Sequence, residues 1–114
     1  MDVAIIAAME EEVAQLRAQL SQAQEVAAFF VDLPIYRGQL LGLDAVLARC
    51  GIGKVNAALA TQYTIDHFKP RVILTCGVAG AISPEVRIGD VVISTGAQQH
   101  DVDARGFGYE RGVI

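Results

Sequence analysis

The sequence lacks the features that would indicate a nucleic-acid-binding, membrane-spanning or secreted protein. Nine basic residues stand against thirteen acidic ones, giving a net charge of −4, and the lysines and arginines form no stripe. This charge balance argues against nucleic acid as a partner. The apolar runs are well short of the ~20 residues that span a bilayer, and the first residues lack the positive flank of a signal peptide. We therefore expect a cytoplasmic protein that contacts neither nucleic acid nor membrane.

Residues that form disulfides or metal sites are also scarce. Cys50 and Cys76 each end an apolar stretch, no CxxC pair is present, and we interpret both cysteines as reduced, buried small hydrophobes. A catalytic thiol is the alternative, but its only candidate bases, His67 and His100, are distant in the sequence. His100, Asp101 and Asp103 form a single cluster, which indicates a hydrogen-bond network rather than a metal site. We predict neither a metal nor a cofactor.

Apolar side chains are what the sequence has in excess, with 53% hydrophobic against 19% charged residues. The 114 residues suffice for one domain or for part of one. An apolar fraction this high indicates that some apolar surface is meant for a partner or for further chain.

Hydrophobic periodicity divides the chain into strands and helices. Val13, Leu16 and Leu20 recur at three- and four-residue steps and give one apolar helical face. The pattern predicts helices at 9–20 and 54–68, strands at 3–7, 25–31, 34–41, 45–49, 71–76 and 91–95, and a loop-like tail at 98–114. This order indicates an α/β fold with a mixed β-sheet flanked by helices. Helical crossovers predict parallel neighbours, and the three strands of residues 25–49 predict an antiparallel meander.

Three of the predicted strands end in turns rich in glycine or alanine. These turns are Ala7-Ala8-Met9, Gly51-Ile52-Gly53 and Gly77-Val78-Ala79-Gly80. If the strands are parallel, all three turns share the sheet edge at which open α/β folds bind ligands, and glycines there let a ligand approach the backbone. The middle turn matches neither the P-loop nor the dinucleotide fingerprint. Two interpretations of the middle turn therefore remain: a tight strand-to-helix connection and a ligand-binding loop.

Glu12, one helical turn beyond Met9, has two interpretations. The residues alone favour a solvated first-turn glutamate that complements the helix dipole. The functional alternative is a general base at the strand edge, which works best when burial raises the pKa of its carboxyl toward neutrality. Phe107 and Tyr109 also have two interpretations. They form either an aromatic lid or subunit contact, or a surface loop that is anchored by their two rings.

Five segments in order resemble those of the 5′-methylthioadenosine/S-adenosylhomocysteine nucleosidases, relatives of the purine nucleoside phosphorylases. They are Ala4–Glu12, Cys50–Val55, Cys76–Gly80, Gly89–Val92 and His100–Tyr109. The similarity runs from Met1 to about Tyr109 and implies hydrolysis of an N-glycosidic bond with release of adenine, a step of methionine salvage. It implies a phosphorylase/hydrolase-like fold that is incomplete here, with residues 1–114 as the amino-terminal portion of a single nucleosidase domain.

The resemblance also implies roles for individual residues. Glu12 would activate the water that attacks the anomeric carbon of an adenine nucleoside. The substrate would be contacted by Ala8 and Met9 at the ribose, by Ile52 at the 5′-substituent, by the Val78-Ala79-Gly80 loop, and by Phe107 and Tyr109 from the neighbouring subunit of a homodimer. Val78 stands where many relatives carry serine, so a hydroxyl contact from that loop is not expected.

The family's chain continues past residue 114 and there supplies the groups that protonate and clamp adenine. We therefore expect little or no hydrolysis by the 114 residues alone. Two alternatives stay open: a related nucleosidase such as futalosine hydrolase, and a noncatalytic nucleoside-binding or dimerisation module. A phosphorylase is disfavoured, since we identify no arginine near the three strand ends that could hold phosphate.

Overall fold

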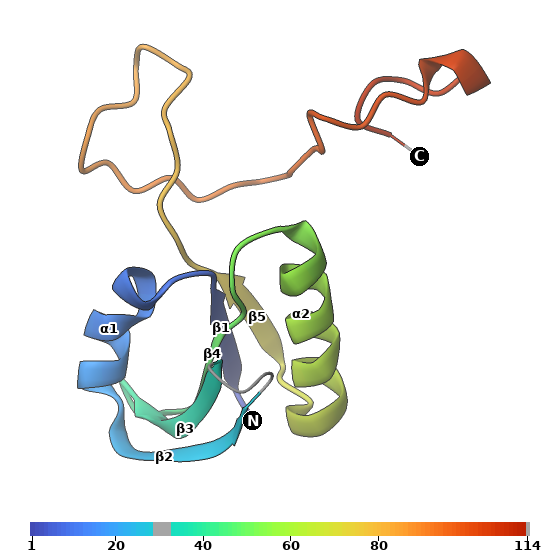
Figure 1. Cartoon of the computed structure of the whole chain (residues 1–114). Coiled ribbons are helices and arrows are strands. Elements are labelled where there is room, and N and C mark those ends of the chain that lie inside the picture. The colour runs from blue at the N-terminus through green and yellow to red at the C-terminus, as the bar shows by residue number, and fades with distance from the viewer. Residues whose placement is uncertain (29–32, 114) are drawn as a thin grey trace. The chain divides into compact units, whose positions relative to one another are not determined.

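The computed structural model describes residues 1–28 and 33–113, which divide into two units, Met1–Ala79 and Gly80–Ile114. The first unit is a β-sheet with one helix on each face (Figure 1). In its described residues, the second unit consists of loops and one short 3₁₀ helix. The elements are β1 (Val3–Ala7), α1 (Glu10–Gln19), β2 (Ser21–Ala28), β3 (Pro34–Leu40), β4 (Leu43–Arg49), α2 (Lys54–Phe68), β5 (Val72–Thr75) and η1 (Arg105–Phe107).

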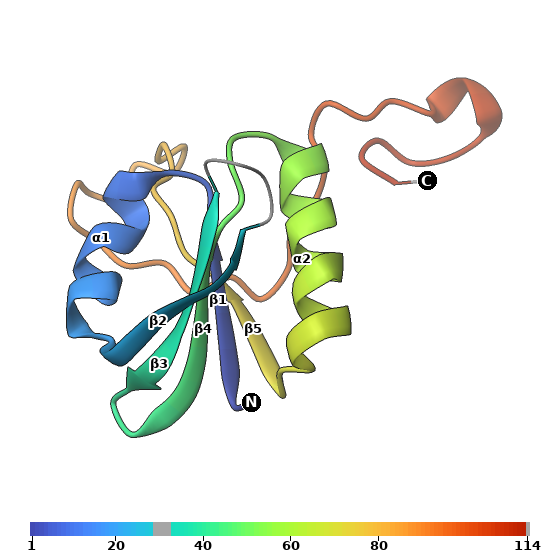
Figure 2. The same cartoon turned by 60° about the horizontal axis from the view of Figure 1, so that its bottom comes forward.

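The sheet has the strand order β2-β3-β4-β1-β5, which Figure 2 shows across its width. β1 pairs in parallel with both β4 and β5, whereas β2, β3 and β4 are antiparallel neighbours. The predicted α/β fold with a mixed, helix-flanked sheet is therefore confirmed, as are the parallel crossovers and the antiparallel meander.

Side-chain alternation along β1 explains why the sheet needs a helix on each face. Val3, Ile5 and Ala7 belong to the core cluster that includes residues of α1, and Ala4 and Ile6 belong to the cluster that includes residues of α2. All five side chains are buried. Because a buried isoleucine contributes roughly 1.5–3 kcal/mol, the two faces of β1 anchor both helices to the sheet.

Part of the apolar surface of the first unit stays exposed. Val72 and Leu74 on the edge strand β5 are 51% and 50% exposed, and Val55 on α2 is 72% exposed. This agrees with the expectation that some apolar surface serves a partner or further chain. Among the described residues, neither helix combines the length and apolarity needed to cross a bilayer.

The predicted strand at 91–95 is wrong, because the structure assigns no strand to these residues. β-Branched residues favour a strand only when a neighbouring strand pairs with them, and the described residues of the second unit contain none. The second predicted strand begins at Ser21 rather than at Glu25, and its predicted residues 29–31 lie outside the described residues. The other predicted elements are confirmed to within two residues.

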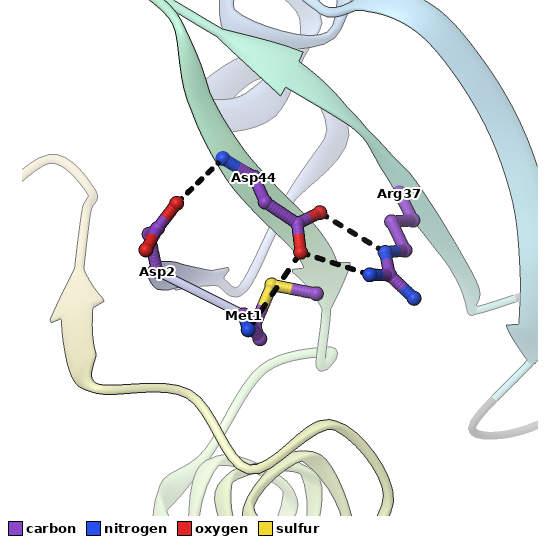
Figure 3. A network of polar contacts seen from close by, with 4 residues as sticks. All are labelled: Met1, Asp2, Arg37 and Asp44. Atoms are coloured by element: carbon purple, nitrogen blue, oxygen red, sulfur yellow. Dashed lines mark hydrogen bonds and ion pairs between the residues drawn. The ribbon is translucent and has the colours of Figure 1, made fainter.

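A polar network joins the start of the chain to β3 and β4 (Figure 3). It lies at the amino-terminal end of β1, whereas the strand-end turns follow its carboxyl end. Arg37 donates from Nε and Nη2 to the two carboxylate oxygens of Asp44 at 3.0 and 2.8 Å. The same carboxylate lies 3.7 Å from the Met1 ammonium, and the Asp44 N–H donates to Asp2 Oδ2 at 3.0 Å. Hydrogen bonding by Arg37 lowers the pKa of the Asp44 carboxyl, so this carboxylate stays ionised and bridges β3, β4 and the start of β1.

Gly38, in the middle of β3, is buried where no larger residue fits. A Cβ at this position would lie 2.6 Å from the Ser21 carbonyl oxygen and 2.7 Å from Leu20 Cγ. We expect Gly38→Ala to lower the free energy of unfolding by about 1–3 kcal/mol, because backbone must move to relieve the overlap. Gly96→Ala is the matched control, since nothing lies within 4 Å of its added Cβ. Equal urea midpoints for the two variants would contradict this account.

Candidate active site

The carboxyl ends of the three parallel strands meet at one edge of the sheet, as the sequence predicts. β4, β1 and β5 lie side by side in this order. Backbone pairing continues just past the outer two strands, where Cys50 N–H donates to the Ala7 carbonyl at 2.8 Å and Cys76 N–H donates to the Ile6 carbonyl at 3.0 Å. The turns that follow the three strands therefore start from adjacent positions.

Glu12 joins two of these turns through its carboxylate. Oε2 accepts hydrogen bonds from the N–H groups of Ala8 and Met9 at 2.9 and 3.0 Å, and Oε1 accepts one from the N–H of Val78 at 3.0 Å. The first two bonds satisfy free donors at the start of α1, and the third ties the β1 turn to the β5 turn. The interpretation of Glu12 as a merely solvated first-turn glutamate is therefore wrong.

Gly77 is the residue that lets the carboxylate come this close to the β5 turn. A Cβ added at position 77 would lie 2.7 Å from Glu12 Oε1 and 3.2 Å from its carboxyl carbon. Cβ atoms do not approach other atoms to that distance, so a side chain here would displace the carboxylate. Glycine at position 77 is thus required by close approach rather than by a left-handed backbone.

The three N–H donors lower the pKa of the Glu12 carboxyl below its ordinary value of 4.5. The bond from Val78 has the largest effect, the bond from Met9 follows, and desolvation opposes them. Burial, which would bring the pKa of a general base toward neutrality, does not prevail here, because hydrogen bonds to the charged form outweigh the loss of solvent. The side chain is accordingly a carboxylate throughout the neutral range.

The lowered pKa of Glu12 predicts a dependence of stability on pH. The contribution of these bonds is complete above the unfolded value of 4.5 and is lost as pH falls through the lower, folded value. We expect the Glu12 carboxyl carbon to titrate below pH 4.5 by NMR. Between about pH 6 and about pH 3, Glu12→Gln should lose less unfolding free energy than the parent chain. An equal loss would show that the bonds do not favour the ionised form.

The other predicted site residues of the first unit lie on the same edge. Ala8 and Met9 are half-buried, and their N–H groups bind the carboxylate. Val78 and Ile52 are 79% and 76% exposed, and Ala79 is exposed as well. One hydrogen-bonded carboxylate therefore lies at the same edge as turns that expose apolar side chains.

The cysteines differ from one another in exposure. Cys50 is buried, as predicted, and burial raises the pKa of its thiol. Cys76 is exposed, contrary to prediction, because it ends an edge strand that has a neighbour on only one side. The candidate base His67 is engaged on α2, where its Nδ1 lies 2.9 Å from the Tyr63 carbonyl oxygen and its ring stacks on the Tyr63 ring. Nothing in this arrangement activates a thiol.

Arg49 is a charged residue at this edge that sequence reasoning missed. It is the last residue of β4 and lies in register with Ala7, so the prediction that no arginine stands near the strand ends is wrong. Its Nη1 lies 3.3 Å from Glu10 Oε2, and Glu10 Oε1 lies 2.6 Å from Arg17 Nη2. Glu10 therefore offsets the guanidinium charge that a phosphate would need, and the phosphorylase alternative stays disfavoured.

The second unit carries the remaining predicted site residues. Gly80 and Phe107 are exposed, the latter by 87%, and Tyr109 is 49% exposed. Asp103, one of the three residues predicted to form a hydrogen-bond network, accepts hydrogen bonds from Arg105 Nε and Nη2 at 2.8 and 2.7 Å. Residues 1–28 and 33–113 contain no group of histidines, cysteines and carboxylates that could hold a metal ion.

The chain is similar to known proteins over nearly its whole length. The family model described as the phosphorylase superfamily matches residues 2–113. The chain is 47% identical, over all 114 residues, to the 5′-methylthioadenosine/S-adenosylhomocysteine nucleosidase of Desulfotalea psychrophila. Among solved structures, it resembles the Neisseria meningitidis nucleosidase in complex with methylthio-immucillin-A, with a TM-score of 0.92 and 42% identity over 99% of this chain.

A second solved structure agrees, that of the Colwellia psychrerythraea nucleosidase in complex with adenine, with a TM-score of 0.93 and 41% identity over 100% of this chain. The chain covers 48% of the Desulfotalea psychrophila protein, and 48% and 46% of the Neisseria meningitidis and Colwellia psychrerythraea chains. It therefore spans about half the length of the relatives it matches and corresponds to their amino-terminal half.

Proposed function

Because this chain belongs to the phosphorylase superfamily, we propose that it forms the water-activating half of an active site for adenine nucleosides. The reaction is hydrolysis of the N-glycosidic bond of 5′-methylthioadenosine and S-adenosylhomocysteine, with release of adenine. The relatives that carry these substrates in their names support the choice of substrate. The observation that carries the proposal is the carboxylate of Glu12, held between two strand-end turns by backbone donors.

The hydrogen bonds of Glu12 indicate which oxygen holds the water. A carboxylate offers about four lone-pair sites, two on each oxygen. Oε2 uses both of its sites on Ala8 and Met9, whereas Oε1 uses one site on Val78. The remaining site on Oε1 accepts a hydrogen bond from water, whose own lone pair then points at the anomeric carbon of a bound nucleoside.

A carboxylate with a lowered pKa suits this reaction better than it suits proton abstraction from bulk water. As the glycosidic bond breaks, positive charge develops on the ribose, and a fixed negative charge beside it stabilises that state. Water that attacks the cationic sugar becomes acidic, so it transfers its proton to Glu12 late in the reaction. The carboxylate therefore orients the water first and accepts the proton afterwards.

The remaining residues would then bind the substrate around this carboxylate. Ala8 and Met9 contact the ribose, Ile52 contacts the 5′-substituent, and Val78, Ala79 and Gly80 also contact the substrate. Phe107 and Tyr109 complete the 5′-pocket of a second subunit in a homodimer. The setting we propose is methionine salvage in the cytoplasm.

Adenine release tests the proposal. We expect the 114 residues alone to release little adenine from 5′-methylthioadenosine, because protonation of the leaving base contributes about 10²–10⁴-fold and the relatives extend well beyond this length. Joined to the carboxy-terminal half of the Desulfotalea psychrophila nucleosidase, the chain should release adenine at enzymatic rates. A folded chimera that binds the nucleoside without cleaving it would favour a noncatalytic binding module instead.

A further inference from the structure

A side-chain hydrogen bond fixes the turn after β4, away from the contacts of Glu12. Gly51 and Gly53 have φ angles of +80° and +105°, in the region that glycine adopts freely and other residues avoid. Between them, the Ile52 carbonyl accepts a hydrogen bond of 2.8 Å from Asn56 Nδ2. The same amide nitrogen packs against Gly51, where an added Cβ would lie 3.2 Å from it. One side chain thus contacts two of the three turn residues.

Two further hydrogen bonds act at the ends of the turn: the Cys50 thiol donates weakly to the Gly51 carbonyl at 3.2 Å, and the Ala57 N–H donates to the Gly53 carbonyl at 3.0 Å. Gly53 is the N-cap of α2 and, as a glycine, has no side chain with which to cap the helix. Without the hydrogen bond from Asn56, two glycines in three residues would give the turn many alternative backbone conformations. Asn56, in the first turn of α2, reaches back toward the strand end rather than capping its own helix. Its hydrogen bond therefore restrains the turn and contributes less to the helix.

We infer that Asn56 is a positioning residue that holds the Gly51–Gly53 turn so that the exposed Ile52 side chain keeps its place at the edge where Glu12 lies. This inference rests on the proposed function, in which Ile52 contacts the 5′-substituent. Asn56 then governs discrimination between nucleosides with and without an apolar 5′-group, although it touches neither.

Two substitutions separate turn positioning from helix stability. Asn56→Ala removes the donor. Asn56→Asp keeps the size of the side chain, but a carboxylate cannot donate to the Ile52 carbonyl, while its negative charge in the first turn of α2 is favoured by the helix dipole. Gln62→Ala is the matched control, because it also deletes a side-chain hydrogen bond of α2, the 3.0 Å bond from Gln62 Nε2 to Asp66 Oδ1.

The first measurement is the backbone order parameter of the turn by ¹⁵N relaxation. We expect values near 0.85 at residues 51–53 in the parent chain and in Gln62→Ala, and a fall to roughly 0.6 or lower in both Asn56 variants. Residues 57–66 of α2 should keep their order in Asn56→Asp. Unchanged order at residues 51–53 in Asn56→Asp would overturn the positioning role.

The second measurement is the ratio of the kcat/KM values of the chimera for 5′-methylthioadenosine and adenosine. We expect this ratio to fall about three- to tenfold in both Asn56 variants, the effect of losing one hydrogen bond, and to stay unchanged in Gln62→Ala. A ratio that is unchanged in the Asn56 variants would overturn the link to specificity. A parent chimera that releases adenine from neither nucleoside would instead overturn the proposed function, while the order parameters still decide the role of Asn56 in the turn.

Discussion

Glu12→Gln should reduce adenine release by the chimera at least about 100-fold, the lower range for loss of a general base or its equivalent. Glutamine keeps the length of the side chain but removes the negative charge. It also replaces one acceptor oxygen with an NH₂ group, which must then face N–H donors of Ala8 and Met9 or of Val78. The variant loses both the fixed orientation of the water and the charge that stabilises the cationic sugar.

Glu11→Gln is the matched control for this experiment, because it makes the same change at the neighbouring exposed position of α1. The rate of adenine release, followed at saturating 5′-methylthioadenosine, should be unaffected in the control. Loss of the helix-capping bonds of Glu12 should also cost about 1 kcal/mol of stability, which urea unfolding measures separately. A folded Glu12→Gln chimera that turns over as fast as Glu11→Gln would remove the basis of the proposed mechanism.

Gly77→Ala should reduce the same activity about ten- to a hundredfold, even though it changes no group that carries charge. The new Cβ would lie 2.7 Å from Glu12 Oε1, and the flexible glutamate side chain yields more easily than the backbone. The carboxylate then loses its bond to Val78 and shifts by about 1 Å, a displacement that costs up to ~10²-fold in a positioned site.

The displacement in Gly77→Ala also has a spectroscopic consequence. The bond from Val78 is the largest cause of the lowered Glu12 pKa, so the carboxyl of Glu12 should titrate at higher pH in this variant than in the parent chain. Gly96→Ala, where nothing lies within 4 Å of the added Cβ, should change neither the activity nor the titration. If Gly77→Ala leaves the Glu12 titration where it is in the parent chain, close approach does not control the carboxylate.

Much of the fold could be predicted because it depends on local patterns. The three- and four-residue spacing of Val13, Leu16 and Leu20 identifies α1, and Pro70 marks the end of the second helix. Once helices separate the strands, parallel pairing and the meeting of three turns at one edge follow from connectivity. Residues 91–95 show the limit of such patterns, since β-branched residues become a strand only where a partner strand is present.

The candidate site could be predicted in its location but not in its chemistry. The position of Glu12 at the strand edge could be predicted, but the balance of backbone donors against burial, which lowers the pKa of its carboxyl, could not. Sequence reasoning missed Arg49, although the residue immediately precedes the Cys50-Gly51 turn, because the pairing of Arg49 with Glu10 depends on the register between β4 and β1. It also overlooked Asn56, whose signal was a short amide side chain three residues after the glycine that precedes α2.

The sequence by itself determined the order of the elements, the two apolar faces of the sheet and the edge at which the turns gather, because periodicity and connectivity are properties of neighbouring residues. Only the tertiary structure decided how Glu12 is used. Its partner, Val78, is 66 residues away in the chain, and no local pattern states which N–H group a carboxylate will meet across a sheet. The register of β1 and β5 brings them together, and the balance of hydrogen bonding against desolvation then sets the charge.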